Sequence, residues 1–339
     1  MEASMAFHVE LISPKNIENA EFPLEKVDSS TPILQGLASL KLDSLDGPEA
    51  KQKPAELLNL GNGGTDYRDL NEFVESKLDE LQRMPMDYYA ERDRHIDVTP
   101  FAFNQVCVNG SNRGMNGSWI SFPNNDPLVT KLHLPGKYIA TSAPVPESFP
   151  FFMQMLEQYA VPLVISLTNF TENYSIKADP YLPYEENENI VYGGGIYEVT
   201  CTKVHSPIQL SDTWLLERRD FKLILRNSST AHCFSQWHLP DWKDYSAGAV
   251  DAVANLVKYA YAYRKENSIL APIVVHCSGG IGRAGTFINC SECYERWNEK
   301  SPVRIFDIAA QSRLQRPGLG GNKAQYEMVY SVFDKLTSS

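Results

Sequence analysis

The spacing of apolar side chains divides the chain into two parts. Residues 1–66 show no steady hydrophobic period, whereas in the remainder apolar residues recur at the spacings of helices and strands. Leu70, Val74 and Leu78 repeat at helical spacing, which predicts an amphipathic helix at the start of the second part. We therefore expect a leader over residues 1–66 and a folded domain over residues 67–336.

Apolar runs and helical periods also mark the later elements of this domain. Short continuous apolar runs predict strands, and apolar residues at three- and four-residue intervals predict helices. The expected strands cover residues 162–167, 195–200, 221–225 and 273–275, and the expected helices cover residues 247–263, 284–298 and 325–336. Strands followed by helices indicate an α/β or α+β fold in a single domain.

Composition and charge narrow the class of protein. The chain has 339 residues, of which 43% are hydrophobic and 22% charged, so it can bury a substantial core. Its 42 acidic and 31 basic residues give a net charge of −11, which argues against nucleic acid or an anionic membrane surface as the main partner. Residues 1–66 hold eleven acidic and five basic residues, which predicts a flexible acidic leader and a more nearly neutral domain. An anionic substrate is still compatible with this net charge, because a local basic pocket can lie inside an acidic protein.

The cysteines and the lack of long apolar stretches indicate the cellular compartment to expect for this protein. The six cysteines show no paired pattern, which argues against a disulfide scaffold. The sequence shows no secretory signal and no run of about 18 apolar residues, so we expect no membrane span. The expected location is a reducing cytoplasm, either of the producing cell or of another cell into which the protein is delivered. Cys290 and Cys293 lie on an expected helix, and we interpret them as structural rather than metal-binding.

The strongest chemical signal is a glycine-rich turn between an expected strand and an expected helix. Successive backbone N–H groups in such a turn, together with the helix N-terminus, form a cradle for an anion. The field that binds the anion also favours a thiolate at Cys277, and the guanidinium of Arg283 can bind two phosphate oxygens at once. The glycines that allow a close approach of the main chain are Gly279, Gly280 and Gly282.

This turn resembles the signature of the tyrosine-specific protein phosphatase family, which reads His-Cys-Ser-x-Gly-x-Gly-Arg-Ser/Thr-Gly. Residues 276–285 match it with one departure. Further segments that resemble the family lie at 94–101 (phosphotyrosine loop), 138–146, Glu172 with Lys177, 181–183, Pro240-Asp241 (Trp-Pro-Asp loop), 313–318 and 325–326. The resemblance covers about residues 67–336 and implies one phosphatase-like domain with a central twisted mixed sheet flanked by helices.

The resemblance also implies roles for individual residues. Cys277 is the expected nucleophile, Arg283 binds the phosphate, and Asp241 protonates the leaving oxygen and later acts as a base. The expected supporting residues are Glu172, which orients Arg283, Lys177, which contacts the closed loop, and His276, which holds the cysteine turn. The expected substrate-binding residues are Ser278, Gly279, Gly280, Ile281, Gly282, His95, Asp97 and Gln325. No metal or other cofactor is required.

The sequence departs from the family pattern at four positions that bear on function. Ala284 replaces the Ser or Thr whose hydroxyl assists departure of the cysteine sulfur, and Gly321 replaces the glutamine that positions the hydrolytic water. His95 replaces the tyrosine of the deep phosphotyrosine slot, and Leu239 replaces the hinge tryptophan. The first two departures weaken the same step, hydrolysis of the phosphocysteine.

Three functions therefore stay open at this point. The favoured one is an active protein-tyrosine phosphatase acting on phosphotyrosine in proteins. The second is a weakly active adaptor that uses the same pocket to bind phosphotyrosine. The third is a phosphatase of broader specificity, for phosphoserine and phosphothreonine or for phosphoinositides, which a shallower pocket at His95 permits. The substrate protein and the oligomeric state are not specified by the sequence.

Overall fold

A computed structural model describes residues 63–80, 85–108, 115–122, 136–226 and 231–338. The predicted leader lies outside the described residues, except for its last four positions. Those positions belong to the first helix, α3, which covers Gly63–Glu80. The amphipathic helix expected near Leu70 is therefore present.

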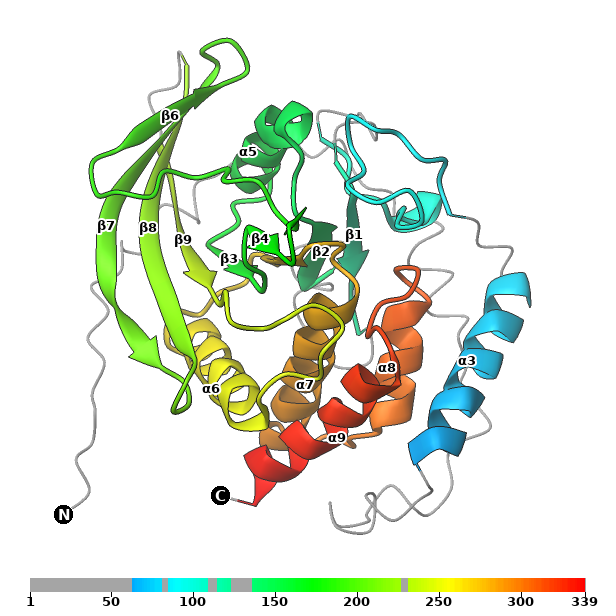
Figure 1. Cartoon of the computed structure of the whole chain (residues 1–339). Coiled ribbons are helices and arrows are strands. Elements are labelled where there is room, and N and C mark those ends of the chain that lie inside the picture. The colour runs from blue at the N-terminus through cyan, green and yellow to red at the C-terminus, as the bar shows by residue number, and fades with distance from the viewer. Residues whose placement is uncertain (1–62, 81–84, 109–114, 123–135, 227–230, 339) are drawn as a thin grey trace, which may run out of the picture.

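An eight-stranded mixed sheet forms the centre of the domain, in the order β1-β2-β10-β3-β9-β8-β7-β6 (Figure 1). The strands β2, β10, β3 and β9 run parallel, and β1, β8, β7 and β6 add antiparallel edges. This confirms the expected central mixed sheet. The strands cover Gly117–Ile120 (β1), Tyr138–Ser142 (β2), Leu163–Ser166 (β3), Asn189–Tyr192 (β6), Tyr197–Gln209 (β7), Leu215–Leu225 (β8), Ala231–His238 (β9) and Ile273–Cys277 (β10).

Helices cover both faces of this sheet (Figure 1). One hydrophobic cluster joins one face to α6, α7, α8 and α9, and a second joins the opposite face to α5. Helix α3 packs against α8 and α9. The helices cover Phe149–Gln158 (α5), Val250–Glu266 (α6), Gly282–Asn298 (α7), Ile305–Arg313 (α8) and Lys323–Thr337 (α9). None of the helices in the described ranges is long and apolar enough to cross a membrane.

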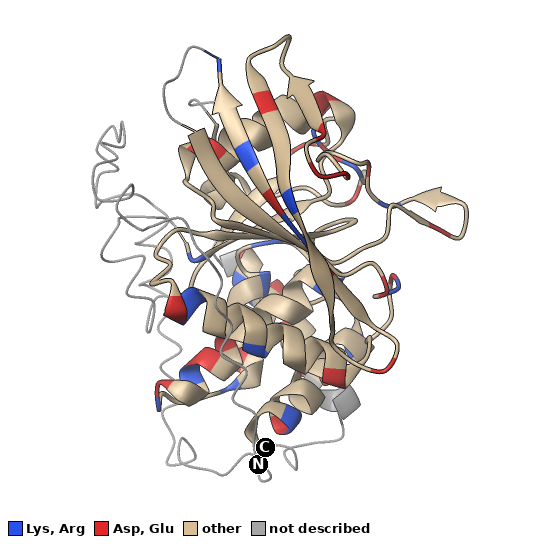
Figure 2. Cartoon of the chain, turned by 90° about the vertical axis from the view of Figure 1, so that its left-hand side faces the viewer, with Lys and Arg blue, Asp and Glu red and all other residues tan. Residues whose placement is uncertain are grey.

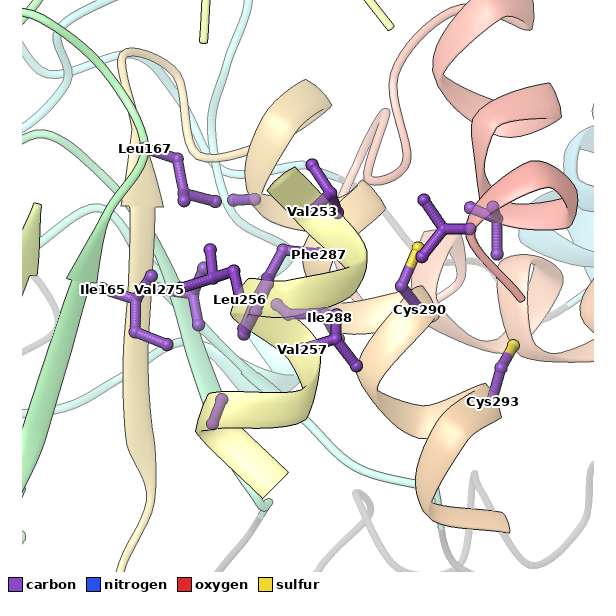
Figure 3. Packing of buried hydrophobic residues seen from close by; sticks show 14 of the residues in the cluster. Ile165, Leu167, Val253, Leu256, Val257, Val275, Phe287, Ile288, Cys290 and Cys293 are labelled. Carbon is purple, nitrogen blue, oxygen red and sulfur yellow. The ribbon is translucent and has the colours of Figure 1, made fainter. Parts of the chain in front are cut away.

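Strand β10 lies in the middle of the sheet and is buried along its whole length. Because side chains alternate across a strand, Val274 faces the cluster with α5, whereas Val275 faces the cluster with α6 and α7. Figure 3 shows Val275 and Ile165 packed toward Leu256 and Phe287 of these helices. Burial on both faces explains the short continuous apolar run that predicted this strand.

Cys290 and Cys293 lie on α7 within the same core (Figure 3). Both side chains are fully buried, and burial raises the pKa of each thiol well above its ordinary value. A thiol that stays protonated and buried is inert, which supports the structural interpretation of this pair.

The hairpin of β7 and β8 is longer than the sequence predicts. We expected strands over 195–200 and 221–225, whereas β7 continues to Gln209 and β8 begins at Leu215. Beyond Cys201 most side chains of β7 are at least partly exposed, so they carry no apolar period. The backbone pairing between the two strands continues there through two register shifts. In the view of Figure 2, acidic and basic residues are interspersed on these strands and on the helices, and no face of a single sign is visible from this side.

Candidate active site

The glycine-rich turn joins the end of β10 at Cys277 to the start of α7 at Gly282. The Cys277 side chain is buried, with 3% of its surface exposed. The carbonyl of Ser278 accepts a hydrogen bond from the Ala143 N–H at 2.9 Å, so it points away from the turn. In a trans peptide the N–H points opposite to the carbonyl, which turns the N–H of the next residue inward.

Arg316 fixes the next two carbonyls in the same way. Its fully buried guanidinium donates to the Gly279 carbonyl at 3.0 Å and to the Gly280 carbonyl at 2.8 Å. It also donates to the side chain of Asn116 at 2.7 Å. Three successive carbonyls are therefore held outward, which turns the N–H groups that follow them toward the inner side of the turn, beside the N-terminus of α7. This orientation suits the anion cradle that the sequence predicts.

Gly280 is required by the geometry of this cradle. Its φ is +66°, in the left-handed region, and a Cβ atom there would lie 2.0 Å from the carbonyl oxygen of Thr141 on β2. Both the backbone conformation and the contact with β2 exclude other residues.

The guanidinium of Arg283 lies fully buried at the other end of the turn. Its Nη1 donates to Glu172 Oε1 at 2.8 Å and to the carbonyl oxygen of Trp242 at 2.7 Å, and its Nη2 donates to Asp244 Oδ1 at 3.1 Å. Within the described part of the chain its buried Nε has no hydrogen-bond partner. Burial lowers the pKa of Arg283, but the negative charges of Cys277, Asp244 and Glu172 outweigh burial, so the pKa lies above its ordinary value. Arg283 is therefore a permanently charged fork with one free N–H at the end of the turn.

Glu172 lies on β4 (Thr171–Glu172), and Lys177 directly follows β5 (Ser175–Ile176), the second strand of the same small hairpin. The expected contact between Glu172 and Arg283 is present. The other oxygen of Glu172 accepts the backbone N–H of Asp244 at 2.9 Å. Lys177 Nζ lies 2.8 Å from Asp244 Oδ2. Both hairpin residues therefore contact the segment that follows Asp241, and both converge on Asp244.

Asp241 itself is not brought to the turn. Its side chain is exposed, and among the described residues the one hydrogen bond to its carboxylate comes from the Leu215 N–H at 3.4 Å. The side chain of Trp242 is instead buried, with its ring 6.2 Å from that of Trp214. Anchoring of Trp242 turns Asp241 outward and Asp244 inward. This geometry differs from the expectation that Asp241 reaches the phosphate.

His276 is buried beside the cysteine. Its Nε2 lies 2.5 Å from the hydroxyl of Tyr181, and its Nδ1 lies 3.1 Å from the carbonyl oxygen of Cys277. Burial lowers the pKa of His276 to about 3, so the ring is neutral at ordinary pH. The neutral ring is positioned to donate to the Cys277 carbonyl and to accept from Tyr181. His276 therefore contacts the cysteine through its backbone, as expected of a residue that holds the turn.

The segment 94–97 forms the rim of the site. Arg94 anchors it by donating to the carbonyls of Ala143 at 3.0 Å and Pro144 at 2.7 Å. His95 Nε2 lies 2.9 Å from the hydroxyl of Ser278, and burial together with Arg94 lowers the pKa of His95. A neutral imidazole therefore borders the turn where the family carries a tyrosine. Asp97 is exposed on this rim.

Gln325 and Asn322 hold the segment that contains Asp244. Gln325 Nε2 donates to the carbonyl of Ser246 at 3.3 Å, and Asn322 Nδ2 donates to the carbonyl of Tyr245 at 3.0 Å. Gly321 has a φ of +63°, in the left-handed region that favours glycine, and a Cβ atom there would lie 2.9 Å from Gly282 Cα and 1.8 Å from the movable Gln325 Oε1. The departure at position 321 is thus built into the packing of this loop.

Among known protein families, the family model described as protein-tyrosine phosphatase matches residues 89–335 of this chain. The chain belongs to the protein-tyrosine phosphatase family. It is 25% identical over 242 residues to tyrosine-protein phosphatase non-receptor type 20 of Mus musculus, covering 71% of this chain and 53% of the relative. It is 26% identical over 243 residues to receptor-type tyrosine-protein phosphatase eta of Homo sapiens, covering 69% of this chain and 16% of the relative.

Solved structures of the phosphatase family show the same fold. The catalytic domain of human protein tyrosine phosphatase non-receptor type 18 superimposes with a TM-score of 0.70 at 20% identity, covering 84% of this chain and 99% of that domain. A structure of PTPN18 in complex with HER2 phosphopeptides superimposes with a TM-score of 0.69 at 19% identity, covering 81% of this chain and 92% of that chain. The chain spans about half the length of the mouse relative and a smaller part of the human receptor-type relative.

Sequence reasoning missed two residues of this site, Arg316 and Asp244. Arg316 lies in a segment that resembles the family, but nothing local shows that its guanidinium reaches the turn. Asp244 did carry a signal, because Trp242 precedes it by two residues, as the tryptophan precedes the aspartate in the Trp-Pro-Asp pattern.

Proposed function

We propose that this chain is a phosphatase that removes phosphate from phosphotyrosine in proteins through a phosphocysteine intermediate. One observation carries the proposal: the buried Cys277 lies in a turn whose N–H groups point inward, beside an Arg283 guanidinium with a free, buried N–H. A phosphoryl group in this cradle would have its negative charge neutralised by fixed donors throughout the reaction.

The two chemical steps follow from these groups. In the first, the Cys277 sulfur attacks phosphorus, the S–P bond forms, and the bond from phosphorus to the phenolic oxygen breaks as an acid protonates that oxygen. In the second, water attacks phosphorus, the S–P bond breaks, and the same group takes a proton from the water. Arg283 and the N–H groups bind the phosphoryl oxygens in both steps. The sequence resemblance assigns the acid to Asp241 in the loop after β9, whereas the contact of Asp244 in the same loop with Arg283 Nη2 at 3.1 Å favours Asp244 for this role.

A phosphotyrosyl peptide is the proposed substrate class. The neutral ring of His95 borders the turn and offers a flat surface to a phenyl ring, and the exposed Asp97 is available to accept hydrogen bonds from a peptide backbone. The structure of PTPN18 with HER2 phosphopeptides supports a peptide ligand for this fold. The smaller ring of His95 is the observation that favours the alternative of a phosphatase with broader specificity.

Steady-state kinetics on matched peptides test the proposal. We expect release of phosphate from a phosphotyrosyl peptide. Its kcat/KM should be at least about tenfold above that for the phosphoseryl peptide of the same sequence, since the phosphate on the shorter serine side chain reaches the cysteine less well. Cys277→Ser, which removes the nucleophile, should be inactive while still binding the phosphotyrosyl peptide. Equal rates on both peptides would favour the broader specificity. Binding without turnover by the wild-type protein would favour the adaptor.

A burst of phenol release is expected if hydrolysis of the phosphocysteine limits turnover. Ala284 is fully buried and carries no hydroxyl to stabilise the departing sulfur, and Gly321 has no side chain to position the hydrolytic water. A hydrogen bond to a charged group contributes roughly 1.5–3 kcal/mol, so its loss slows the second step about ten- to a hundredfold. Rapid mixing with an aryl phosphate should show one equivalent of phenol before a slow steady state.

The matched variant for this prediction is Ala284→Ser, which adds one oxygen at the same place. It should raise kcat and shrink the burst if the missing hydroxyl limits the second step. A linear trace from the first milliseconds, or a kcat that does not change in Ala284→Ser, would contradict the explanation.

A further inference from the structure

We propose that an apolar rim beside the cradle binds apolar side chains that flank the phosphotyrosine of a substrate protein. The inference rests on the proposed function and narrows the substrate class of the same site. The rim consists of four side chains, Ile96, Tyr174, Ile176 and Tyr245. They are the most exposed large apolar side chains among the described residues, at 64–105% of their surface, and the next is Val191 at 54%. Exposed apolar side chains that gather at one place mark an interaction surface, whereas single scattered ones do not.

Two members of the rim adjoin residues that contact the turn or its arginine. Ile96 directly follows His95, whose Nε2 lies 2.9 Å from the hydroxyl of Ser278. Tyr245 directly follows Asp244, whose carboxylate pairs with the phosphate-binding arginine at 3.1 Å. The charge of Asp244 also acts on the ring of His95, so the two segments lie near each other.

The other two members belong to the β4–β5 hairpin, which is held by the same arginine. Glu172 accepts a hydrogen bond from Arg283 Nη1 at 2.8 Å, and Thr171 pairs with Ile176 across the hairpin. Because side chains alternate across a strand, Ile176 lies on the face opposite to Glu172. Tyr174 lies in the turn at the tip. One face of the hairpin is thus fixed to the site, whereas its tip and its other face are exposed.

Both tyrosines of the rim have a backbone conformation that bulky residues avoid. The φ angle is +61° at Tyr174 and +57° at Tyr245, in the left-handed region. Of the non-glycine residues with a positive φ in the described ranges, these two are the aromatic ones. Left-handed backbone is unfavourable for a bulky residue, and an exposed ring gains nothing from burial. Residues that keep both disadvantages in the free protein are typical of a binding surface.

The occupant that this position favours is the protein that carries the phosphotyrosine. To reach the cradle, the phosphotyrosine enters beside all three segments, so the residues next to it in its own chain lie against them. In an extended peptide, residues two positions away lie about 7 Å along the chain. Tyr174 likewise lies two residues, about 7 Å along a strand, from Glu172 at the arginine. The rim is therefore within reach of the flanking residues, and only of these.

Charge on the three segments favours apolar over acidic flanking residues. The cations Arg94 and Lys177 are each paired with a carboxylate. The exposed charged side chains of residues that border the rim are two aspartates and one lysine, Asp97, Asp241 and Lys243. Acidic flanking residues therefore meet a net negative charge, whereas apolar ones gain from burial against the rim.

Two phosphotyrosyl peptides test this preference. They differ only at the two positions on each side of the phosphotyrosine, which are leucine in one peptide and glutamate in the other. We expect the wild-type kcat/KM to be about tenfold higher for the leucine peptide, because its side chains are buried against the rim. A kcat/KM for the glutamate peptide that equals or exceeds this value would overturn the proposal.

Substitutions in the rim locate the preference. Tyr174→Gly and Ile96→Ser should each lower kcat/KM for the leucine peptide about three- to tenfold, and that for the glutamate peptide much less. Glycine suits the positive φ at position 174, so the urea midpoint of Tyr174→Gly should be no lower than that of the wild type. Val191→Ser is the matched control, because it removes an exposed apolar side chain on β6 and should keep the preference. A preference that survives both rim substitutions would overturn the proposal.

Peptide binding to Cys277→Ser separates this inference from the proposed function. This variant keeps the rim, and fluorescence anisotropy of labelled peptides measures their dissociation constants without turnover. If the wild type hydrolyses neither peptide while Cys277→Ser binds the leucine peptide more tightly, the proposed function fails and the rim stands. If the wild type hydrolyses both peptides and Cys277→Ser binds both equally, the proposed function stands and the rim is overturned.

Discussion

Replacing Arg283 by lysine is expected to lower kcat/KM for an aryl phosphate by about two to three orders of magnitude, the cost of losing a fixed donor to the transition-state charge. The guanidinium contacts three partners at once, Glu172, the Trp242 carbonyl and Asp244, and its Nε stays free for an anion. A lysine ammonium is a single point charge on a flexible stem and cannot reproduce this fork. The loop that Arg283 holds closed should then open as well.

Inhibition by inorganic phosphate measures the same loss without chemistry. The inhibition constant should rise in Arg283→Lys by a factor comparable to the fall in kcat/KM, because both report binding of phosphoryl oxygens. Arg304→Lys is a matched control, since Arg304 directly precedes α8 and pairs with Asp307 at 3.1 Å, away from the turn. If inorganic phosphate inhibited Arg283→Lys as strongly as the wild type, Arg283 would not be part of the anion site.

The sequence predicts the cradle well because its chemistry is local. The strand, the three glycines, the cysteine and the arginine all lie within residues 272–286, and their order alone fixes a strand, a turn and a helix start. The central strand β10 and the helix α7 are found where the hydrophobic pattern puts them. Supporting contacts with Glu172 and Lys177 were found through the family resemblance, although their common partner, Asp244, was not.

The loop after β9 shows why local patterns fail. Two consecutive segments each match two of the three positions of Trp-Pro-Asp: Leu239-Pro-Asp241 has the proline and Trp242-Lys-Asp244 has the tryptophan. Because the first segment has the proline, the sequence was interpreted as placing the Trp-Pro-Asp loop there. In the structure the choice depends on burial of Trp242 against Trp214 and on the hydrogen bond from Arg283, contacts that join segments far apart in the chain. The local hydrophobic pattern of the sequence does not predict such long-range contacts.

Arg316 fails to show in the sequence for the same reason. It is separated from the turn by α7 and α8, and its side chain is one of several arginines in residues 296–316. Only the fold brings its guanidinium against the carbonyls of Gly279 and Gly280. The extension of β7 and β8 was missed because it is paired through the backbone, and its side chains are mostly outside the core.

Gly280→Ala is expected to disrupt both folding and activity, because the turn has no space for one added carbon. A left-handed φ of +66° costs an alanine roughly 1–2 kcal/mol, and the Cβ atom would lie 2.0 Å from the Thr141 oxygen on the central sheet. That contact is with backbone, so it is relieved only by moving the turn or β2, which costs about 1–3 kcal/mol more. We expect the free energy of unfolding in urea to fall by about 2–5 kcal/mol.

The neighbouring glycine supplies the matched control. A Cβ atom on Gly279 would meet only side-chain atoms at ordinary contact distances, with His95 Cδ2 nearest at 3.5 Å. The free energy of unfolding of Gly279→Ala should therefore lie within about 1 kcal/mol of the wild-type value, since Gly279 has no positive φ. If both variants unfolded with the same free energy, the close approach of Gly280 to Thr141 would not be what shapes the cradle. A large difference between two adjacent alanines would show that the anion site depends on this contact with β2.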